Sequence, residues 1–184
     1  REYATAYLDD IVVFSSTWEL HLLHLRKLLG ALDTEGLKAN PQKSILATDQ
    51  INYLGYRIHA GMITPQVDKV EAIRHIPVPT SKKEIRSFLG LLGYYRRFIP
   101  SFSELASPLT DMLRKEHPNK FRQLSPSQQA CFDSLKIALC TNPVLHCPDF
   151  TQEFVLQTDA SGTGLGAVLS QPGVGDVFHP VVFL

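Results

Sequence analysis

The apolar residues between Ser81 and Pro100 recur at the spacing of one face of a helix. They stand at positions i, i+3, i+4, i+7 and i+10 and are Ile85, Phe88, Leu89, Leu92 and Tyr95. This period is that of an α-helix, and Ser81 is a typical N-cap with Glu84 three residues later. Since proline cannot continue a helix, we expect one amphipathic helix over Ser81–Ile99, whose apolar side must be covered by other elements.

Strand patterns lie before and after this helical centre. Two β-prone runs, Ala4–Leu8 and Ile11–Phe14, flank Asp9-Asp10, which predicts a hairpin with these two aspartates as its connection. Further short strands are expected at Lys43–Ala47, Tyr53–His59, Met62–Thr64, Phe154–Thr158, Gly164–Ser170 and Val177–Leu184. Strands and helices that are separated along the chain in this way indicate an α+β fold.

Other helices are expected on both sides of the central one. Ser16 and Glu19 form a capping box before a leucine-rich helix that ends at Gly36. Pro65 begins another helix, which the Pro77-Val78-Pro79 break ends, and this break is a candidate hinge. The remaining segments are a short helix near Glu104–Lys115, a polar linker over Glu116–Leu124 and a helix that begins after the cap Ser125-Pro126.

Composition restricts the class of protein without identifying it. Lys plus Arg number 18 and Asp plus Glu number 18 among the 184 residues, so net charge gives no indication of a nucleic-acid partner. The three cysteines form no Cys-x-x-Cys pair, which argues against a disulfide framework or a cysteine metal site. No apolar run reaches the roughly 18 residues of a membrane span and no signal peptide is present. We therefore expect an intracellular protein that is not secreted; because the sequence starts and stops within strand patterns, we also expect a piece of a longer polypeptide.

The sharpest chemical feature is the pair of adjacent carboxylates in Tyr7-Leu8-Asp9-Asp10. Like charges this close cost free energy unless a cation is bound. In two-metal sites, divalent ions about 4 Å apart are held by carboxylates, and Mg²⁺ prefers such oxygen ligands. The alternative is a solvated turn, because aspartate is common in turns. Apolar residues on both flanks favour the metal site, since they make the turn project from a buried sheet.

Several segments in order resemble the reverse transcriptases of gypsy-type LTR retrotransposons. Tyr7–Ser15 is similar to motif C of that family and Gly36–Lys43 to motif D, whereas Tyr53–Ile58 resembles the primer grip. Ile85–Pro100 looks like the thumb helix. The first two strands of the family's ribonuclease H-like domain are similar to Leu156–Ser161 and Gly164–Gln171.

The resemblance implies a fold and a set of functional residues. The fold is the C-terminal part of a polymerase palm (residues 1–64), helices of the thumb and connection (65–120) and the opening strands of a ribonuclease H-like domain (121–184). Asp9 and Asp10 are implied as metal ligands and catalytic residues of the polymerase, and Asp159 as the first metal ligand and catalytic residue of the nuclease. Lys43 is implied as a catalytic residue beside the leaving pyrophosphate. The implied nucleic-acid contacts are Tyr7, Leu54, Gly55, Tyr56, Arg86, Gly90, Tyr94 and Arg97.

The resemblance also implies a cofactor and partners. The cofactor is Mg²⁺, with Mn²⁺ as an alternative. The partners are RNA and DNA template–primer duplexes, deoxynucleoside triphosphates and the remainder of the Pol polyprotein, and no membrane is among them.

The residues by themselves leave alternatives open. On the helix expected over Ser81–Ile99, Arg86, Gly90, Gly93 and Arg97 share the face opposite the apolar stripe. That face suits a duplex backbone, but taken alone the residues favour a contact with another helix through the glycines, with the arginines merely solvated. Taken alone, Lys43 is an ordinary surface lysine, Gly55 an ordinary strand glycine and Asp159 a turn or cap former.

The parent protein is thus predicted to be an RNA-directed DNA polymerase with ribonuclease H activity. It extends a primer by two-metal nucleotidyl transfer and cleaves RNA in RNA–DNA hybrids. This chain by itself is expected to be inactive, because a third polymerase carboxylate and the other nuclease acids are missing from it. The alternative is a domesticated or decayed remnant that acts only as a nucleic-acid-binding module, which salt-dependent binding without nucleotide incorporation would identify.

Overall fold

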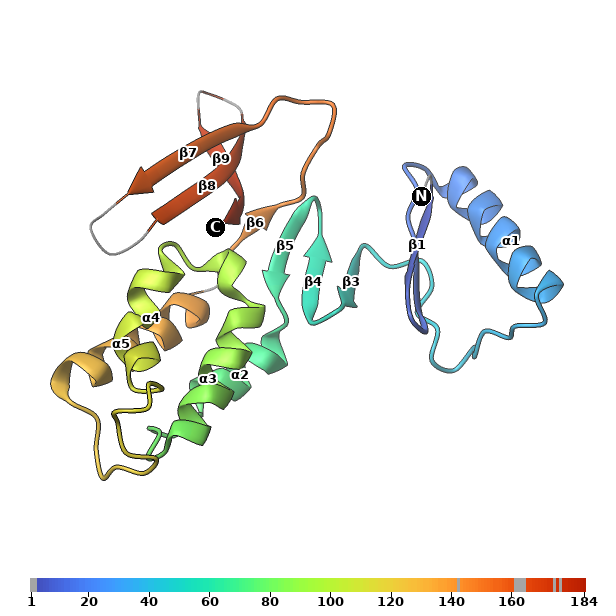
Figure 1. Cartoon of the computed structure of the whole chain (residues 1–184). Helices are drawn as coiled ribbons and strands as arrows, with labels where there is room; N and C mark the ends of the chain where they lie inside the picture. The colour runs from blue at the N-terminus through green and yellow to red at the C-terminus, as the bar shows by residue number, and fades with distance from the viewer. Residues whose placement is uncertain (1–2, 142, 161–164, 174, 176) are drawn as a thin grey trace. The chain divides into compact units, whose positions relative to one another are not determined.

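The computed structural model describes residues 3–141, 143–160, 165–173, 175 and 177–184. The chain forms two compact units, Arg1–Asp49 and Gln50–Leu184 (Figure 1), and each is described by itself. Helices and antiparallel strands are both present, which confirms the α+β class. The features expected at Arg1, Asn142, Ser161 and Gly164 lie outside the described residues.

The first unit begins with a hairpin of β1 (Ala4–Tyr7) and β2 (Asp10–Val13). Tyr7 pairs with Asp10, so the connection is Leu8-Asp9, and the expected connection at Asp9-Asp10 is wrong by one residue. The reason is the backbone of Leu8, whose φ is +53°. Two-residue turns that match the twist of the strands need a positive φ at their first position. Asp10 is therefore the first residue of β2.

The helix of this unit, α1 (Trp18–Thr34), begins one residue later than the capping box predicted. Its N-cap is Thr17 rather than Ser16, because the Thr17 side chain accepts a hydrogen bond from the Leu20 amide at 3.3 Å. The helix ends as expected before Gly36, which has a φ of +70°.

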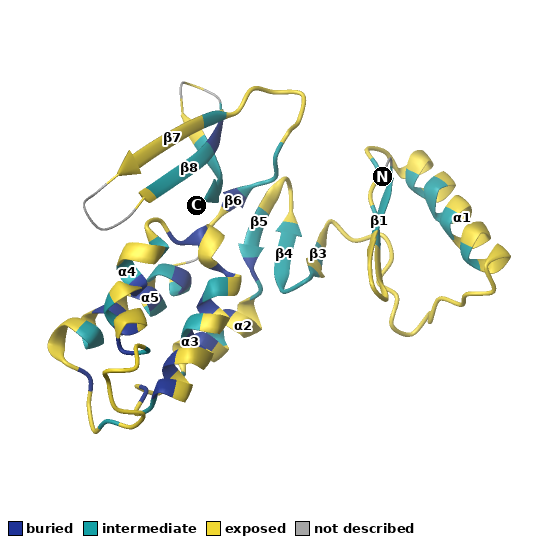
Figure 2. Cartoon of the chain, viewed as in Figure 1, coloured by how far each residue is buried: buried dark blue, intermediate teal, exposed yellow. Residues whose placement is uncertain are grey.

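No described residue of the first unit is buried (Figure 2). The helix is held to the hairpin by His24, whose ring stacks on Tyr3 with 4.5 Å between centroids. Nδ1 of His24 also lies 2.7 Å from the Ser15 hydroxyl. A two-stranded hairpin with one helix and no core is marginal in water, so the apolar side chains of this unit need a covering that these residues do not supply.

The strand expected at Lys43–Ala47 is absent. Asn40 accepts hydrogen bonds from the Gln42 amide through its side chain at 3.0 Å and from the Ser44 hydroxyl through its carbonyl at 2.8 Å. These bonds make the chain turn where the apolar pattern predicted an extended backbone.

The second unit starts with an antiparallel sheet in the order β3-β4-β5-β6. Its strands are β3 (Gln50–Tyr53), β4 (Tyr56–His59), β5 (Met62–Pro65) and β6 (Leu145–His146). The single strand expected over Tyr53–His59 is wrong, because a turn at Leu54-Gly55 divides it. Both turn residues have positive φ, +48° and +72°, which is the pattern of a type I′ turn. β6 was not predicted and pairs with β5 across a large sequence separation.

Helices follow the sheet. They are α2 (Val67–Arg74), α3 (Lys82–Tyr94), the 3₁₀ turn η1 (Arg96–Phe98), α4 (Phe102–Asp111) and α5 (Pro126–Cys140). Ser81 and Ser125 are the expected N-caps of α3 and α5. Three bounds differ from expectation: Pro65 is the last residue of β5, α3 ends at Tyr94 rather than Ile99, and α4 ends before Lys115.

The segment expected as a polar linker, Glu116–Leu124, is hydrogen-bonded to the start of α3. The Phe121 amide donates to the Thr80 carbonyl at 2.9 Å, and the Lys82 amide donates to the Asn119 carbonyl at 2.9 Å. Leu124 is buried. The segment is therefore part of the packed unit.

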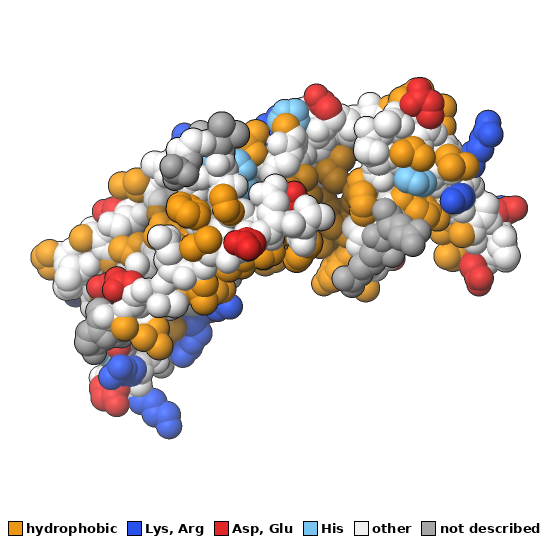
Figure 3. All heavy atoms as spheres, turned by 90° about the horizontal axis from the view of Figure 1, so that it is seen from above, with side chains coloured by type: hydrophobic (Ala, Val, Ile, Leu, Met, Phe, Trp, Pro, Cys, Tyr) orange, Lys and Arg blue, Asp and Glu red, His pale blue; other side chains and the backbone are white. Residues whose placement is uncertain are grey.

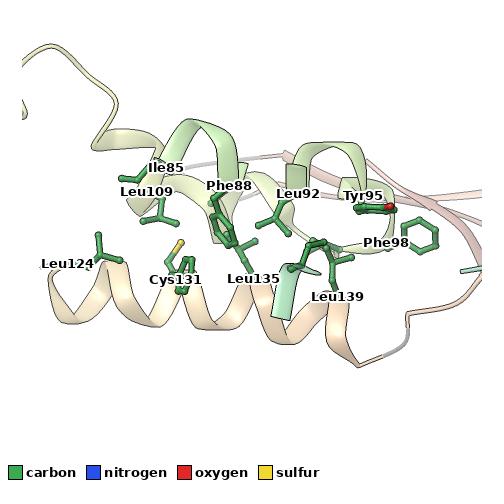
Figure 4. Close-up of a cluster of buried hydrophobic side chains, with 14 of the residues drawn as sticks. Ile85, Phe88, Leu92, Tyr95, Phe98, Leu109, Leu124, Cys131, Leu135 and Leu139 are labelled. Carbon is green, nitrogen blue, oxygen red and sulfur yellow. The ribbon is translucent and has the colours of Figure 1, made fainter. Parts of the chain in front are cut away.

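One hydrophobic core joins α3, η1, α4 and α5 (Figure 4). Phe88 of α3 lies against Phe132 of α5 with 4.6 Å between ring centroids. The fully buried side chains of the core include Ile85, Leu92, Tyr95, Phe98, Leu109, Leu135 and Leu139. The apolar stripe predicted between Ser81 and Pro100 is thus confirmed as a core face.

The last sheet has the order β7-β8-β9, with β7 (Val155–Ala160), β8 (Leu165–Pro172) and β9 (Phe178–Phe183) antiparallel. The side chain of Gln171, which is buried, accepts from the Asp149 amide at 2.8 Å and donates to the Asp149 carbonyl at 2.7 Å. Leu156 and Leu165 are exposed, and hydrophobic side chains reach the surface in the view of Figure 3.

The division of the chain into palm, thumb and ribonuclease H-like parts at residues 64/65 and 120/121 stays a prediction.

Candidate functional site

The turn after β1 exposes two adjacent carboxylates. Asp9 and Asp10 are both exposed, and neither forms an ion pair with another described residue. Leu8 before them is 86% exposed and held at positive φ. A left-handed backbone costs about 1–2 kcal/mol outside glycine, and such strained residues cluster at functional sites.

The donor set of this turn fits a hard divalent cation. Both side chains of Asp9 and Asp10 offer only oxygen, and Mg²⁺ is commonly held by one or two carboxylates together with substrate phosphates. No cluster of three or more potential metal-binding side chains occurs in the described ranges. Asp9 and Asp10 could thus supply two of the oxygen ligands of such an ion.

Lys43 is exposed in the turn that follows Asn40. Within the described part of the chain, it makes no ion pair with Asp9 or Asp10. The structure does not bring this lysine together with the carboxylates.

The turn at Leu54-Gly55 contacts the C-terminal end of α3, and both lie in the second unit. The Tyr94 hydroxyl donates to the Leu54 carbonyl at 2.5 Å, and the Tyr95 hydroxyl donates to the Gly55 carbonyl at 3.1 Å. In return, the Tyr56 hydroxyl donates to the Tyr94 carbonyl at 3.2 Å. Segments that are 40 residues apart, expected separately as primer grip and thumb, thus form one surface.

Aromatic rings and one guanidinium extend this surface. Tyr56 stacks on Tyr94 with 5.4 Å between ring centroids and 10° between their planes. The Arg97 guanidinium carbon lies 5.9 Å from the centroid of the Tyr56 ring. Burial raises the pKa of Tyr56, and the neighbouring Tyr94 adds to this while Arg97 opposes it. Tyr94 is 50% exposed, so its ring can meet a ligand.

Arg97 is not on the helical face where the sequence placed it. α3 ends at Tyr94, and Arg97 belongs to the 3₁₀ turn η1. Its guanidinium is directed to Tyr56 instead of continuing the row of Arg86 and Gly90.

Arg86, Gly90 and Tyr94 lie on one exposed side of α3 at steps of four residues. A Cβ built at Gly90 or at Gly93 meets no atom of the described residues within 4 Å. The alternative interpretation, in which these glycines pack against another helix, is therefore wrong for the described part of the chain. The face is open to a bulky partner.

Asp159 is exposed on β7 and pairs in register with Gly166 of β8. It is a strand residue and not the turn former that the local pattern allowed. The candidate site residues outside the second unit are Tyr7, Asp9, Asp10 and Lys43.

Tyr95 was missed as a functional candidate, because it belongs to the apolar stripe. It is 2% exposed, yet its hydroxyl reaches the Gly55 carbonyl. A tyrosine at a core position needs a partner for its hydroxyl, and this requirement is the one signal that the sequence offered.

Two family models match the chain. Residues 1–58 match the model described as reverse transcriptase (RNA-dependent DNA polymerase), and residues 124–184 match the model described as the RNase H-like domain found in reverse transcriptase. No described helix has the length and apolar character needed to cross a membrane.

Similar proteins are Pol polyproteins of transposable elements. The retrovirus-related Pol polyprotein from transposon 297 of Drosophila melanogaster is 39% identical over 184 residues, which is 100% of this chain and 17% of that protein. That from transposon opus of the same species is 40% identical over 92% of this chain and 18% of its own length. The transposon Tf2-3 polyprotein of Schizosaccharomyces pombe is 34% identical over 98% of this chain and 13% of that protein. The chain thus spans less than a fifth of these curated relatives.

Solved structures share the fold. The foamy viral protease-reverse transcriptase in complex with double-stranded DNA has a TM-score of 0.83 and 24% identity, over 98% of this chain and 37% of that one. The complex of this viral protein with an RNA/DNA hybrid has a TM-score of 0.82 and 24% identity, over 98% of this chain and 24% of that one. This likeness concerns the fold. The two family matches and the Pol relatives show that the chain belongs to the reverse transcriptase and ribonuclease H-like region of gypsy-type retrotransposon Pol polyproteins.

Proposed function

We propose that the protein containing this chain is an RNA-directed DNA polymerase with ribonuclease H activity. The observation that carries the proposal is the strained turn at Leu8, which exposes the carboxylates of Asp9 and Asp10 side by side. The family matches over residues 1–58 and 124–184 support it. In this proposal, residues 1–64 belong to the palm, 65–120 to the thumb and connection, and 121–184 to the ribonuclease H-like domain.

Asp9 and Asp10 hold Mg²⁺ in the polymerase site, with Mn²⁺ as the alternative, and Asp159 holds it in the nuclease site. A bound divalent ion stabilises the charge on the attacking and leaving oxygens. Lys43 screens the charge of the leaving pyrophosphate. Because the described ranges hold no cluster of three metal-binding side chains, further carboxylates come from the rest of the protein, and the chain alone does not turn over.

A template–primer duplex lies along the exposed side of α3 and against the Leu54–Gly55 turn. Arg86 and Arg97 contact its phosphates, Tyr94 presents its exposed ring to sugar or base, and Tyr56 takes part with Leu54 and Gly55 at the turn. Tyr7 contacts nucleic acid beside the carboxylates. Open space at Gly90 supports this arrangement, as do the double-stranded DNA and the RNA/DNA hybrid bound by the foamy viral proteins that share the fold. Deoxynucleoside triphosphates, the rest of the Pol polyprotein and an intracellular site of action complete the proposal.

The test is incorporation of labelled deoxynucleotides on a primed RNA template by the parent protein in Mg²⁺. Template-dependent extension that stops on chelation of the ion is the expected result. Duplex binding that weakens with salt, without any incorporation, would instead support the alternative of a nucleic-acid-binding remnant.

A further inference from the structure

The carbonyl groups of Leu54 and Gly55, in the turn between β3 and β4, accept hydrogen bonds from residues outside this hairpin. Leu54 O accepts from the Tyr94 hydroxyl at 2.5 Å. Gly55 O accepts twice, from the Tyr95 hydroxyl at 3.1 Å and from the Gln66 amide at 3.1 Å. A carbonyl oxygen has two lone pairs, so both acceptor sites of Gly55 are filled, and one of them requires a tyrosine hydroxyl.

Gly55 is also fitted to the two tyrosine rings. A Cβ at this position would lie 3.2 Å from Cε1 of Tyr94 and 3.2 Å from the hydroxyl oxygen of Tyr95. Its φ of +72° is a conformation that side chains rarely adopt. The tyrosines at the end of α3 therefore leave no room for a side chain at this turn.

The two tyrosines differ in what they can reach. Tyr94 is 50% exposed, so it can touch a ligand and hold the turn at once, whereas Tyr95 is 2% exposed. The ring of Tyr95 is part of the core, where phenylalanine would fill the same volume, and only its hydroxyl meets the turn. Burial, with the neighbouring Tyr94 and Tyr56, raises the pKa of Tyr95 to about 12, so the hydroxyl stays a donor well into the alkaline range.

We propose that Tyr95 is a positioning residue for the primer strand: its buried hydroxyl, together with that of Tyr94, fixes the Leu54–Gly55 turn to the end of α3, so that turn and helix meet a nucleic-acid duplex as one rigid surface. This inference rests on the proposed function. Tyr95 touches no nucleic acid and acts only through the placement of the turn. Small displacements of a reacting group lower turnover strongly, by up to about 100-fold for 1 Å.

The experiment compares Tyr95→Phe with wild type in the parent enzyme. We expect the rate of single-nucleotide incorporation at saturating primer–template to fall about 10- to 100-fold. Affinity for the duplex should stay within about twofold, because Arg86, Gly90 and Tyr94 are untouched. Tyr3→Phe is the matched control, since no hydrogen bond of its hydroxyl occurs among the described residues and its ring contacts remain.

Hydrogen exchange supplies a readout on the turn itself. In Tyr95→Phe the Gln66 amide, which shares the Gly55 acceptor, should exchange faster, while the amides of α5 keep their protection. Unchanged incorporation by Tyr95→Phe in an active wild-type background would overturn the inference. Equal losses in rate and affinity that follow a lowered melting temperature would also overturn it, since they show a structural role alone. A wild-type enzyme without incorporation would overturn the proposed function first, and the inference with it.

Discussion

Replacing Gly90 by leucine separates a duplex-binding role of α3 from a packing role. A Cβ at Gly90 meets no atom of the described residues within 4 Å, so a larger side chain displaces nothing there. Glycine inside a helix is about 0.8–1.0 kcal/mol less favourable than alanine, and leucine is close to alanine. We expect Gly90→Leu to raise the free energy of unfolding by about 0.5–1 kcal/mol, which gives a small rise in melting temperature.

The same leucine stands between Arg86 and Tyr94 on the exposed side of the helix, where the duplex is proposed to approach. Each 1.4 kcal/mol of lost contact is a factor of about ten in affinity. We therefore expect the affinity for an RNA/DNA hybrid to fall about tenfold or more while stability rises slightly. Opposite signs in the two measurements are the signature of an open binding face.

Thermal unfolding and fluorescence anisotropy with a labelled hybrid, both on the parent enzyme, make the comparison. Ser134→Leu is the control, because Ser134 is exposed in the middle of α5, a helix that contributes no residue to the proposed interface. A lowered melting temperature with unchanged affinity would refute the reasoning. It would show that Gly90 packs against another element, since overpacking costs about 1–3 kcal/mol.

Three further predictions follow from single contacts. Gln171→Leu leaves the Asp149 amide and carbonyl without their partners, so the free energy of unfolding should fall by about 1–3 kcal/mol in denaturant titrations, whereas Gln157→Leu on exposed β7 should leave it nearly unchanged. Arg86→Gln should weaken duplex binding equally for all sequences, and the slope of log affinity against log salt concentration should fall by about one, the value of one phosphate contact. An unchanged slope would show that Arg86 is merely solvated. Burial and the adjacent His179 lower the pKa of His146 below its ordinary 6.5, so the unfolded chain binds a proton first as pH falls. The free energy of unfolding should therefore fall as pH drops below about 6.5 and level off below the pKa of His146 in the folded protein. In melting curves measured against pH, His146→Gln should show a smaller pH dependence.

Much of the fold followed from local patterns. α3 and α5 formed where periodic apolar residues coincide with the caps Ser81 and Ser125, because both determinants lie within a few residues of each other. The hairpin turn was misplaced by one residue because leucine is not expected at positive φ. β6 was missed because it consists of Leu145 and His146, whose partners in β5 are some 80 residues earlier.

In the candidate site, too, local features were predicted and contacts between distant segments were not. The carboxylates at Asp9 and Asp10 could be found from sequence, because adjacent acids in a short hairpin are themselves unusual. The joining of Tyr94 and Tyr95 to Leu54 and Gly55 could not, since it depends on side-chain hydrogen bonds across 40 residues. Arg97 was assigned to the wrong face because the helix was extended past Tyr94, where the chain changes to a 3₁₀ turn.

We propose that Asp9 and Asp159 belong to two separate metal sites in one enzyme. The direct measurement assays primer extension and ribonuclease H cleavage on the same preparation of the parent protein, for Asp9→Asn and for Asp159→Asn. Each substitution removes a charge while nearly preserving the shape of the side chain. We predict that Asp9→Asn lowers extension by several orders of magnitude and spares cleavage, and that Asp159→Asn does the reverse. Equal loss of both activities from either substitution, in protein with an unchanged melting temperature, would contradict the account.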